Sequence, residues 1–142
     1  MRSKAPLALM EQVVMVLVFA LAAALCLQVF VLSDQMSEKN RDTDHAVLLA
    51  QNTAEIIKAC GGVDGAQEIL GGETEQMMWC SYYYEDLTPA PNRESSFYEV
   101  DVLPGDSGVE GLGQANIEVF RWDGNEGLFA LNVAWQEVNG NG

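Results

Sequence analysis

The chain has 142 residues, of which 21 are acidic and 7 are basic, so its formal net charge is −14. A surface with this balance has too few cations to neutralise phosphates, which argues against nucleic acid as a partner. The length allows one modest domain with an added segment.

The segment closest to the N-terminus is apolar over a length that fits a membrane. From Val13 to Leu32 the only strongly polar side chain is Gln28, and a helix needs about 20 residues to cross a hydrocarbon core. Arg2 and Lys4 precede this run, which predicts a cytoplasmic N-terminus and an extracytoplasmic C-terminal domain. The run ends in QVFVLSDQ, without a small-residue cleavage site, and this favours an anchor over a signal peptide.

One helix is expected to continue beyond this apolar run. No Gly or Pro occurs between Leu7 and Cys60, and Gly61-Gly62 supplies a stop. After a polar stretch, an apolar stripe returns at helical spacing, formed by Ala46, Leu49, Ala50, Thr53, Ile56, Ile57 and Cys60. We therefore expect a transmembrane half over residues 7–32 and an extracytoplasmic half over residues 33–62, whose stripe covers a globular head.

Residues 63–142 predict that head, a small antiparallel sheet of about four strands. A short helical turn over residues 64–70, capped by Asp64, comes first. Alternating apolar and polar residues are typical of strands with one covered face and one face toward water; they occur over residues 77–85, 96–103, 115–122 and 128–138. WDGNEG predicts a hairpin, and LPGDSGVEGLG an irregular connection. The fold class is α+β, with the long helix packed on the sheet.

No catalytic constellation is visible in this chain. His45 is the only histidine, and no serine or cysteine lies in a nucleophile motif, so we expect neither an enzyme nor a cofactor. A structural zinc site needs about four nitrogen or sulfur ligands, so no metal is expected. Cys60 and Cys80 leave two alternatives: a disulfide in an extracytoplasmic head, contributing about 3 kcal/mol, or two buried free thiols.

The aromatic residues of the head also allow two interpretations. Tyr82, Tyr83 and Tyr84 follow one another in the first strand-like run. Aromatic residues suit the core of a small sheet, and exposed tyrosines would instead suit a binding surface. The loop PGDSGVEGLG is the other segment that a binding module could use.

A carboxylate, Glu11, stands near the start of the apolar run. An acid within hydrocarbon is costly, by a few kcal/mol at the bilayer centre on insertion scales, and such residues usually have a partner. The alternative is that Glu11 lies close enough to the cytoplasmic face to reach headgroup water. The first interpretation makes Glu11 an assembly residue.

A basic leader over residues 1–6, followed by LALME with the glutamate at its fifth position, resembles the start of type IV pilins and of the pseudopilins of type II secretion. The resemblance implies that a prepilin peptidase cuts between Pro6 and Leu7 and methylates the amine of Leu7. It implies that Glu11 pairs with this amine on a neighbouring subunit. It also implies two kinds of partner, an inner-membrane platform protein and other pilin-like subunits.

These patterns predict a minor pilin or pseudopilin-like structural subunit, anchored in the cell membrane by one pass and assembling into a filament through its N-terminal helix. The family has Gly or Ala where this chain has Pro6, and usually Phe where it has Leu7. Pro6 keeps a second interpretation open, in which the chain is a non-polymerising, membrane-anchored scaffold or binding protein with an extracytoplasmic head.

Overall fold

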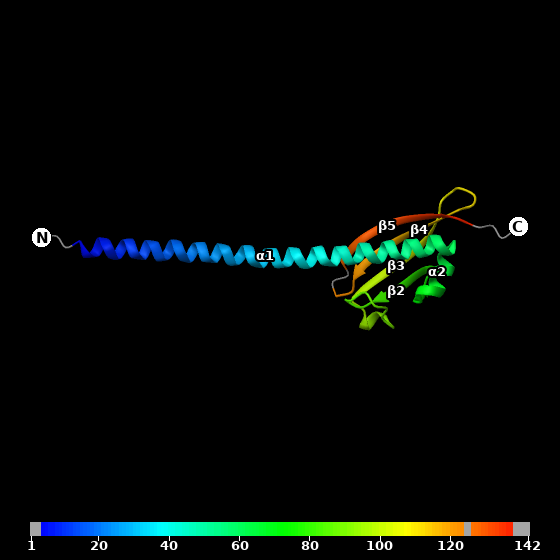
Figure 1. Cartoon of the computed structure of the whole chain (residues 1–142), viewed down its shortest axis with the longest axis horizontal. Helices are drawn as coiled ribbons and strands as arrows, with labels where there is room; N and C mark the ends of the chain where they lie inside the picture. Colours follow the sequence, from blue (N-terminus) through cyan, green and yellow to red (C-terminus); the bar gives the residue numbers. More distant parts are fainter. Residues whose placement is uncertain (1–3, 124–125, 138–142) are drawn as a thin grey trace. The chain divides into compact units, whose positions relative to one another are not determined.

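The computed structural model describes residues 4–123 and 126–137 of the chain (Figure 1). By contacts, the chain divides into two compact units, residues 1–40 and residues 41–142. The elements in chain order are helices α1 (Ala5–Cys60) and α2 (Val63–Leu70), strands β1 (Glu73–Glu75) and β2 (Met78–Tyr83), the 3-10 helix η1 (Arg93–Ser95), and strands β3 (Tyr98–Asp106), β4 (Leu112–Arg121) and β5 (Glu126–Gln136).

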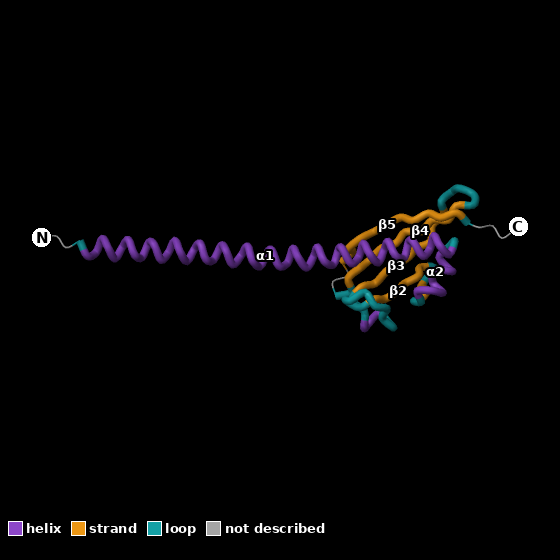
Figure 2. Tube along the Cα trace, viewed as in Figure 1, coloured by secondary structure: helices purple, strands orange, loops and turns teal. Residues whose placement is uncertain are grey.

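The five strands form one antiparallel meander in the order β1-β2-β3-β4-β5 (Figure 2). The predicted α+β class, with a long helix packed on an antiparallel sheet, is confirmed. The predicted count of about four strands is corrected to five, because β1 pairs with the outer edge of β2. All three residues of β1 are exposed and none is apolar, so no hydrophobic pattern marks this strand.

Within the unit of residues 41–142, the last five turns of α1 cover one face of the sheet, as Figure 1 shows. The predicted stripe is largely confirmed, although Cys60 is exposed and Ile56 is only partly buried. The helix residues buried there are Asp42, Ala46, Leu49, Ala50, Thr53, Ala54 and Ile57. They pack on Trp79, Tyr83, Tyr98, Val100, Val102, Ala115, Ile117, Val119 and Val133 from the sheet, with Ala66 from α2.

The end of α1 follows the expected stop signal, but the start of α2 does not follow the predicted cap. Gly61 adopts a φ of 72° and the amide of Gly62 donates to the Ile57 carbonyl at 3.0 Å, as glycine commonly does at a helix end. The residue before α2 is Gly62, without a side-chain cap, and Asp64 lies inside the first turn. The predicted Asp64 cap is therefore wrong.

The glycine-rich connection is more regular than its composition indicates. β3 continues through Pro104 to Asp106, and Pro104 faces Ala115 of β4. Proline cannot donate to a sheet ladder, so it is confined to positions where one side of the strand is unpaired. Here the pairing of β3 with β2 stops at Val102, which leaves that side of Pro104 without a strand. The predicted irregular segment shrinks to residues 107–111.

Parts of three predictions lie outside the described residues: the start of the leader (residues 1–3), the tip of the hairpin (124–125) and the chain after residue 137. In the described part of the last strand, Leu131, Val133 and Trp135 are more buried than Asn132, Ala134 and Gln136. The predicted alternation in this strand is therefore confirmed.

Candidate functional site

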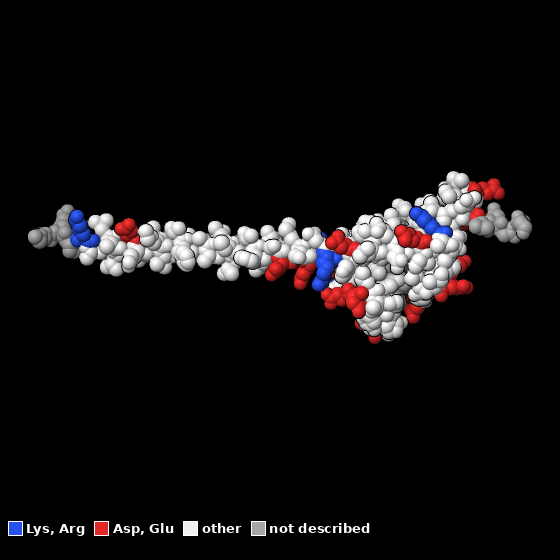
Figure 3. Space-filling model, in the orientation of Figure 1, with Lys and Arg blue, Asp and Glu red and all other residues white. Residues whose placement is uncertain are grey.

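The N-terminal unit contains an apolar helical segment whose side chains are all exposed within this single chain. Residues 7–32 lie in α1, and each of them is exposed. By length and composition, α1 is a helix able to cross a membrane. Figure 3 shows this segment as almost entirely uncharged. A large exposed apolar surface marks contact with a membrane or with another protein.

Polar groups stand at the start of this segment. Pro6 lies in the first turn of α1, where its missing N–H costs no helical hydrogen bond. Leu7 and Glu11 are four residues apart in α1, so the helical repeat places both side chains on one side of the helix. Lys4 comes just before the helix and lines one surface hollow together with Leu7 and Glu11. Arg2, the other basic residue before the apolar run, lies outside the described residues.

The second unit holds a buried polar network between α1 and the sheet. Asp42 is 2% exposed, accepts a hydrogen bond from the Tyr98 hydroxyl at 3.0 Å and pairs with Arg121 at 2.7 Å. His45 Nδ1 lies 3.2 Å from the same hydroxyl. Burial, followed by Asp42, raises the pKa of Tyr98. His45 is therefore partly buried in this network, and Asp42 was not identified from the sequence.

The other face of the sheet carries a second cluster, formed by Cys80 on β2 with Glu99 and Asp101 on β3. Their sulfur and carboxylate oxygen atoms all lie within 4.8 Å of one another. Cys80 is 2% and Glu99 is 4% exposed, although this face was predicted to meet water. Arg93 of η1 explains part of the burial, because its Nε donates to Glu99 Oε2 at 3.0 Å and its guanidinium lies 4.4 Å from the centre of the Trp122 ring.

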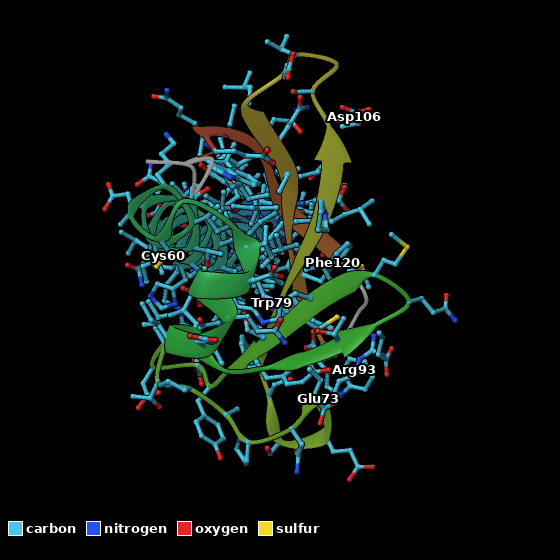
Figure 4. The ribbon with its side chains drawn as sticks, turned by 90° about the vertical axis from the view of Figure 1, so that its right-hand side faces the viewer. Cys60, Glu73, Trp79, Arg93, Asp106 and Phe120 are labelled. Atoms are coloured by element: carbon cyan, nitrogen blue, oxygen red, sulfur yellow. The ribbon has the colours of Figure 1, made fainter. Side chains whose placement is uncertain are left out.

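Register aligns this cluster with further acids. Glu73, Cys80, Asp101 and Glu118 are consecutive cross-strand partners in β1, β2, β3 and β4, so their side chains share one face. Figure 4 shows Glu73 and Arg93 near the same part of the sheet, with Trp79 of β2 closer to the helices. Acids placed directly opposite one another are destabilising in a sheet.

Burial sets the titration of this cluster. It raises the pKa of the Cys80 thiol to about 12, and Asp101 adds to the rise. Burial, and after it Asp101, raises the pKa of Glu99, while Arg93 opposes that rise. Burial also raises the pKa of Asp101. At neutral pH the thiol is protonated, and each ionised carboxylate opposes folding.

We expect Asp101→Asn to increase the free energy of unfolding at neutral pH when no metal ion is present, because the substitution removes a buried carboxylate charge. The pKa of Asp101 is higher in the folded chain than the ordinary carboxyl value near 4. The protonated carboxyl therefore favours the folded state at low pH, and this contribution to stability is lost as the pH rises through the folded-state pKa. The advantage of the variant should therefore shrink as the pH falls toward 4. Glu75, Cys80, Arg93 and Glu118 also act on this carboxyl.

Chemical denaturation of the full chain in detergent and chelator, from pH 7.5 to pH 4, measures this difference. Glu55→Gln is the matched control, because Glu55 is an exposed acid on α1 and its replacement should leave the profile close to that of the wild type. An Asp101→Asn chain less stable than the wild type at every pH would contradict the prediction.

The structure also bears on the cysteine alternatives and on the tyrosines. Cys60 and Cys80 are free thiols, the first exposed and the second buried, so the structure contains no disulfide between them and buries one of the two. Tyr82 and Tyr83 are 6% and 5% exposed, and Tyr84 is 38% exposed. Burial of the first two favours a core role for them over a tyrosine binding surface.

The C-terminal part of α1 thus packs, with α2, on a five-stranded antiparallel meander. The N-terminal part of α1 is an apolar segment with a carboxylate near its start. Comparison with protein-family models, with curated proteins and with solved structures finds no match. The arguments for function therefore rest on the residues themselves.

Proposed function

We propose that this chain is a membrane-anchored structural subunit, a minor pilin or pseudopilin, that assembles into a filament through its N-terminal helix. One observation carries the proposal: residues 7–32 form a helix that is exposed along its whole length and apolar except for Glu11, Gln12 and Gln28. Glu11 is the only residue among them that carries a charged side chain. Such an apolar surface is removed from water either by lipid or by packing in a bundle of identical helices. The carboxylate needs a partner, which lipid tails do not supply.

The sequence also provides for close contact between such helices. Helices associate in membranes through close packing and polar contacts, and Ala20, Ala22, Ala23 and Ala24 allow close approach. In this proposal the N-terminus is cytoplasmic, the head is extracytoplasmic, and Glu11 pairs with the amine of Leu7 on a neighbouring subunit. Prepilin peptidase and an inner-membrane platform protein are the proposed partners.

Processing is the first test of this proposal. We expect co-expression of the full chain with its native prepilin peptidase to yield an N-terminal, methylated Leu7 by mass spectrometry of the intact protein. Pro6 at the cut supports the competing function, a single-pass scaffold or binding protein that does not polymerise. An intact leader in the presence of active peptidase would favour that second function.

Assembly is tested with the native thiol in the middle of the apolar segment. In a Cys60→Ser background, we expect oxidation in membranes to cross-link copies through Cys26, and Glu11→Gln to lower the yield. A polar contact between membrane helices contributes about 1–2 kcal/mol, so the loss should be roughly 5- to 30-fold. Glu38→Gln changes an exposed acid of the same helix outside the apolar segment and serves as the control. Equal yields from the two variants would remove Glu11 from assembly.

A further inference from the structure

The cluster on the uncovered face of the sheet has ligand chemistry that filament assembly does not use. Its members are Cys80, Glu99 and Asp101, two residues on β3 and one on the neighbouring strand β2. We propose that these three side chains bind a thiophilic divalent cation of the zinc class. The proposal rests on the head alone and is independent of the proposed function.

The geometry fits the coordination sphere of zinc. Zinc binds thiolate sulfur at about 2.3 Å and carboxylate oxygen at about 2.0–2.2 Å, so its ligand atoms lie roughly 3.5 Å apart. The three atoms here lie within 4.8 Å of one another, and small side-chain rotations close the difference. Three protein ligands leave one position for water or for Glu73, whose Cα is the cross-strand partner of Cys80.

One unsatisfied buried atom, the Oδ1 of Asp101, indicates that the cluster lacks a partner. Asp101 Oδ1 is buried, and among the described residues it has no hydrogen-bond partner. Cys80 is 2% exposed, and its thiol is hydrogen-bonded to Asp101 within the cluster. Buried polar atoms are normally paired, and a cation placed among the three side chains would give Asp101 Oδ1 the partner that it lacks.

Charge also favours a bound cation. A divalent ion held by one thiolate and two carboxylates leaves one net negative charge. Arg93, whose Nε lies 3.0 Å from Glu99 Oε2, neutralises that charge. Without a cation, the single guanidinium faces Glu99, and Asp101 lies opposite Glu118 on β4. Burying acids in this way is costly unless each is paired or coordinates a metal.

The ligand set selects the class of ion. Calcium and magnesium take oxygen ligands, whereas thiolate selects softer ions such as zinc. Cys80 therefore favours a softer ion over calcium at this cluster. Asp101 is only partly buried, which leaves access for the ion from the solvent side of the sheet.

The test uses the full chain in detergent, without a histidine tag, carrying Cys26→Ser and Cys60→Ser so that Cys80 is the only thiol. After chelator treatment, Co²⁺ is titrated as the probe. We expect one equivalent to bind with thiolate-to-cobalt charge-transfer absorption, Zn²⁺ to displace it, and excess Ca²⁺ to leave it in place. Absence of the thiolate band, or displacement by Ca²⁺, would overturn the proposal.

Two variants assign the ligands. Cys80→Ser should abolish the charge-transfer band. Asp101→Asn should weaken binding at least 10-fold, since even outer-shell changes cost roughly 10- to 100-fold in metal affinity. Glu55→Gln should bind like the parent chain, and circular dichroism checks that each variant is folded. If Cys80→Ser fails to fold, Asp101→Asn decides: an affinity equal to that of Glu55→Gln would overturn the proposal.

Discussion

Trp79→Ala is expected to destabilise the head by about 4 kcal/mol, within the 3–5 kcal/mol typical of removing a buried tryptophan. Trp79 is 2% exposed and belongs to the core between α1, α2 and the sheet. Its indole N–H donates to the Gly71 carbonyl at 2.8 Å, so the substitution also leaves that carbonyl without its donor. Stabilities of single domains are about 5–15 kcal/mol, so this loss is a large fraction of the total.

The backbone around Trp79 has little room for repacking. Gly72 adopts a φ of 103°, and a Cβ added there would lie 2.7 Å from the indole nitrogen and would also overlap the Cys80 carbonyl. The chain therefore passes directly over the indole on its way from α2 into β1. This contact fixes the start of β1, and with it the alignment of Glu73 opposite Cys80.

Trp122→Ala is the matched control for this substitution. Trp122 is 39% exposed, and its ring packs against the Arg93 guanidinium, a contact that contributes about 0.5–1 kcal/mol at an exposed site. Urea denaturation of the full chain in detergent, followed by near-ultraviolet circular dichroism, reports the head. Equal losses in the two variants would contradict the assignment of Trp79 as the main core residue.

The elements that could be predicted from the sequence are those with local periodicity. The stripe from Ala46 to Ile57 and the alternation in the last strand arise from the helical and strand repeats themselves, and the structure confirms both. β1 has three exposed polar residues and is held by pairing with β2, so it carries no pattern of its own. The extension of β3 through Pro104 depends on where the neighbouring strand stops, which the local sequence does not encode.

The two polar clusters were missed for a different reason. Asp42 lies four residues before Ala46 on the same stripe, but a charged residue there is indistinguishable from the end of the stripe until Arg121, 79 residues away, is placed beside it. Alternation puts Cys80, Glu99 and Asp101 on the uncovered face, yet their proximity depends on the register between β2 and β3. The apolar segment and Glu11 needed no tertiary information, because they are contiguous in the chain.

Asp42→Ala is the second substitution expected to have a large effect, a loss of about 2–3 kcal/mol. Breaking a buried ion pair costs roughly 3–5 kcal/mol when the remaining charge is left unpaired. The cost is smaller here, because the Arg121 side chain is 32% exposed and retains Asp123 at 2.7 Å. Tyr98 is 0% exposed, and its hydroxyl loses the carboxylate acceptor and keeps only His45 Nδ1 at 3.2 Å. Loss of such a buried hydrogen bond accounts for about 1–3 kcal/mol.

Two further substitutions separate these contributions. Asp42→Asn retains an acceptor for Tyr98 but removes the charge opposite Arg121, so we expect a smaller loss than for Asp42→Ala. Asp44→Ala changes an exposed acid two residues further along α1 and should stay within about 0.5 kcal/mol of the wild type.

A double-mutant cycle of Asp42→Ala with Tyr98→Phe then isolates the pair, because residues in one hydrogen-bond network couple by about 0.5–3 kcal/mol. Denaturation of the four full-length chains in detergent gives the coupling. A strong coupling means that the network holds the beginning of the packed part of α1, at Asp42, onto β3 and β4. Additive losses would contradict that role and would leave the apolar stripe alone to hold the helix on the sheet.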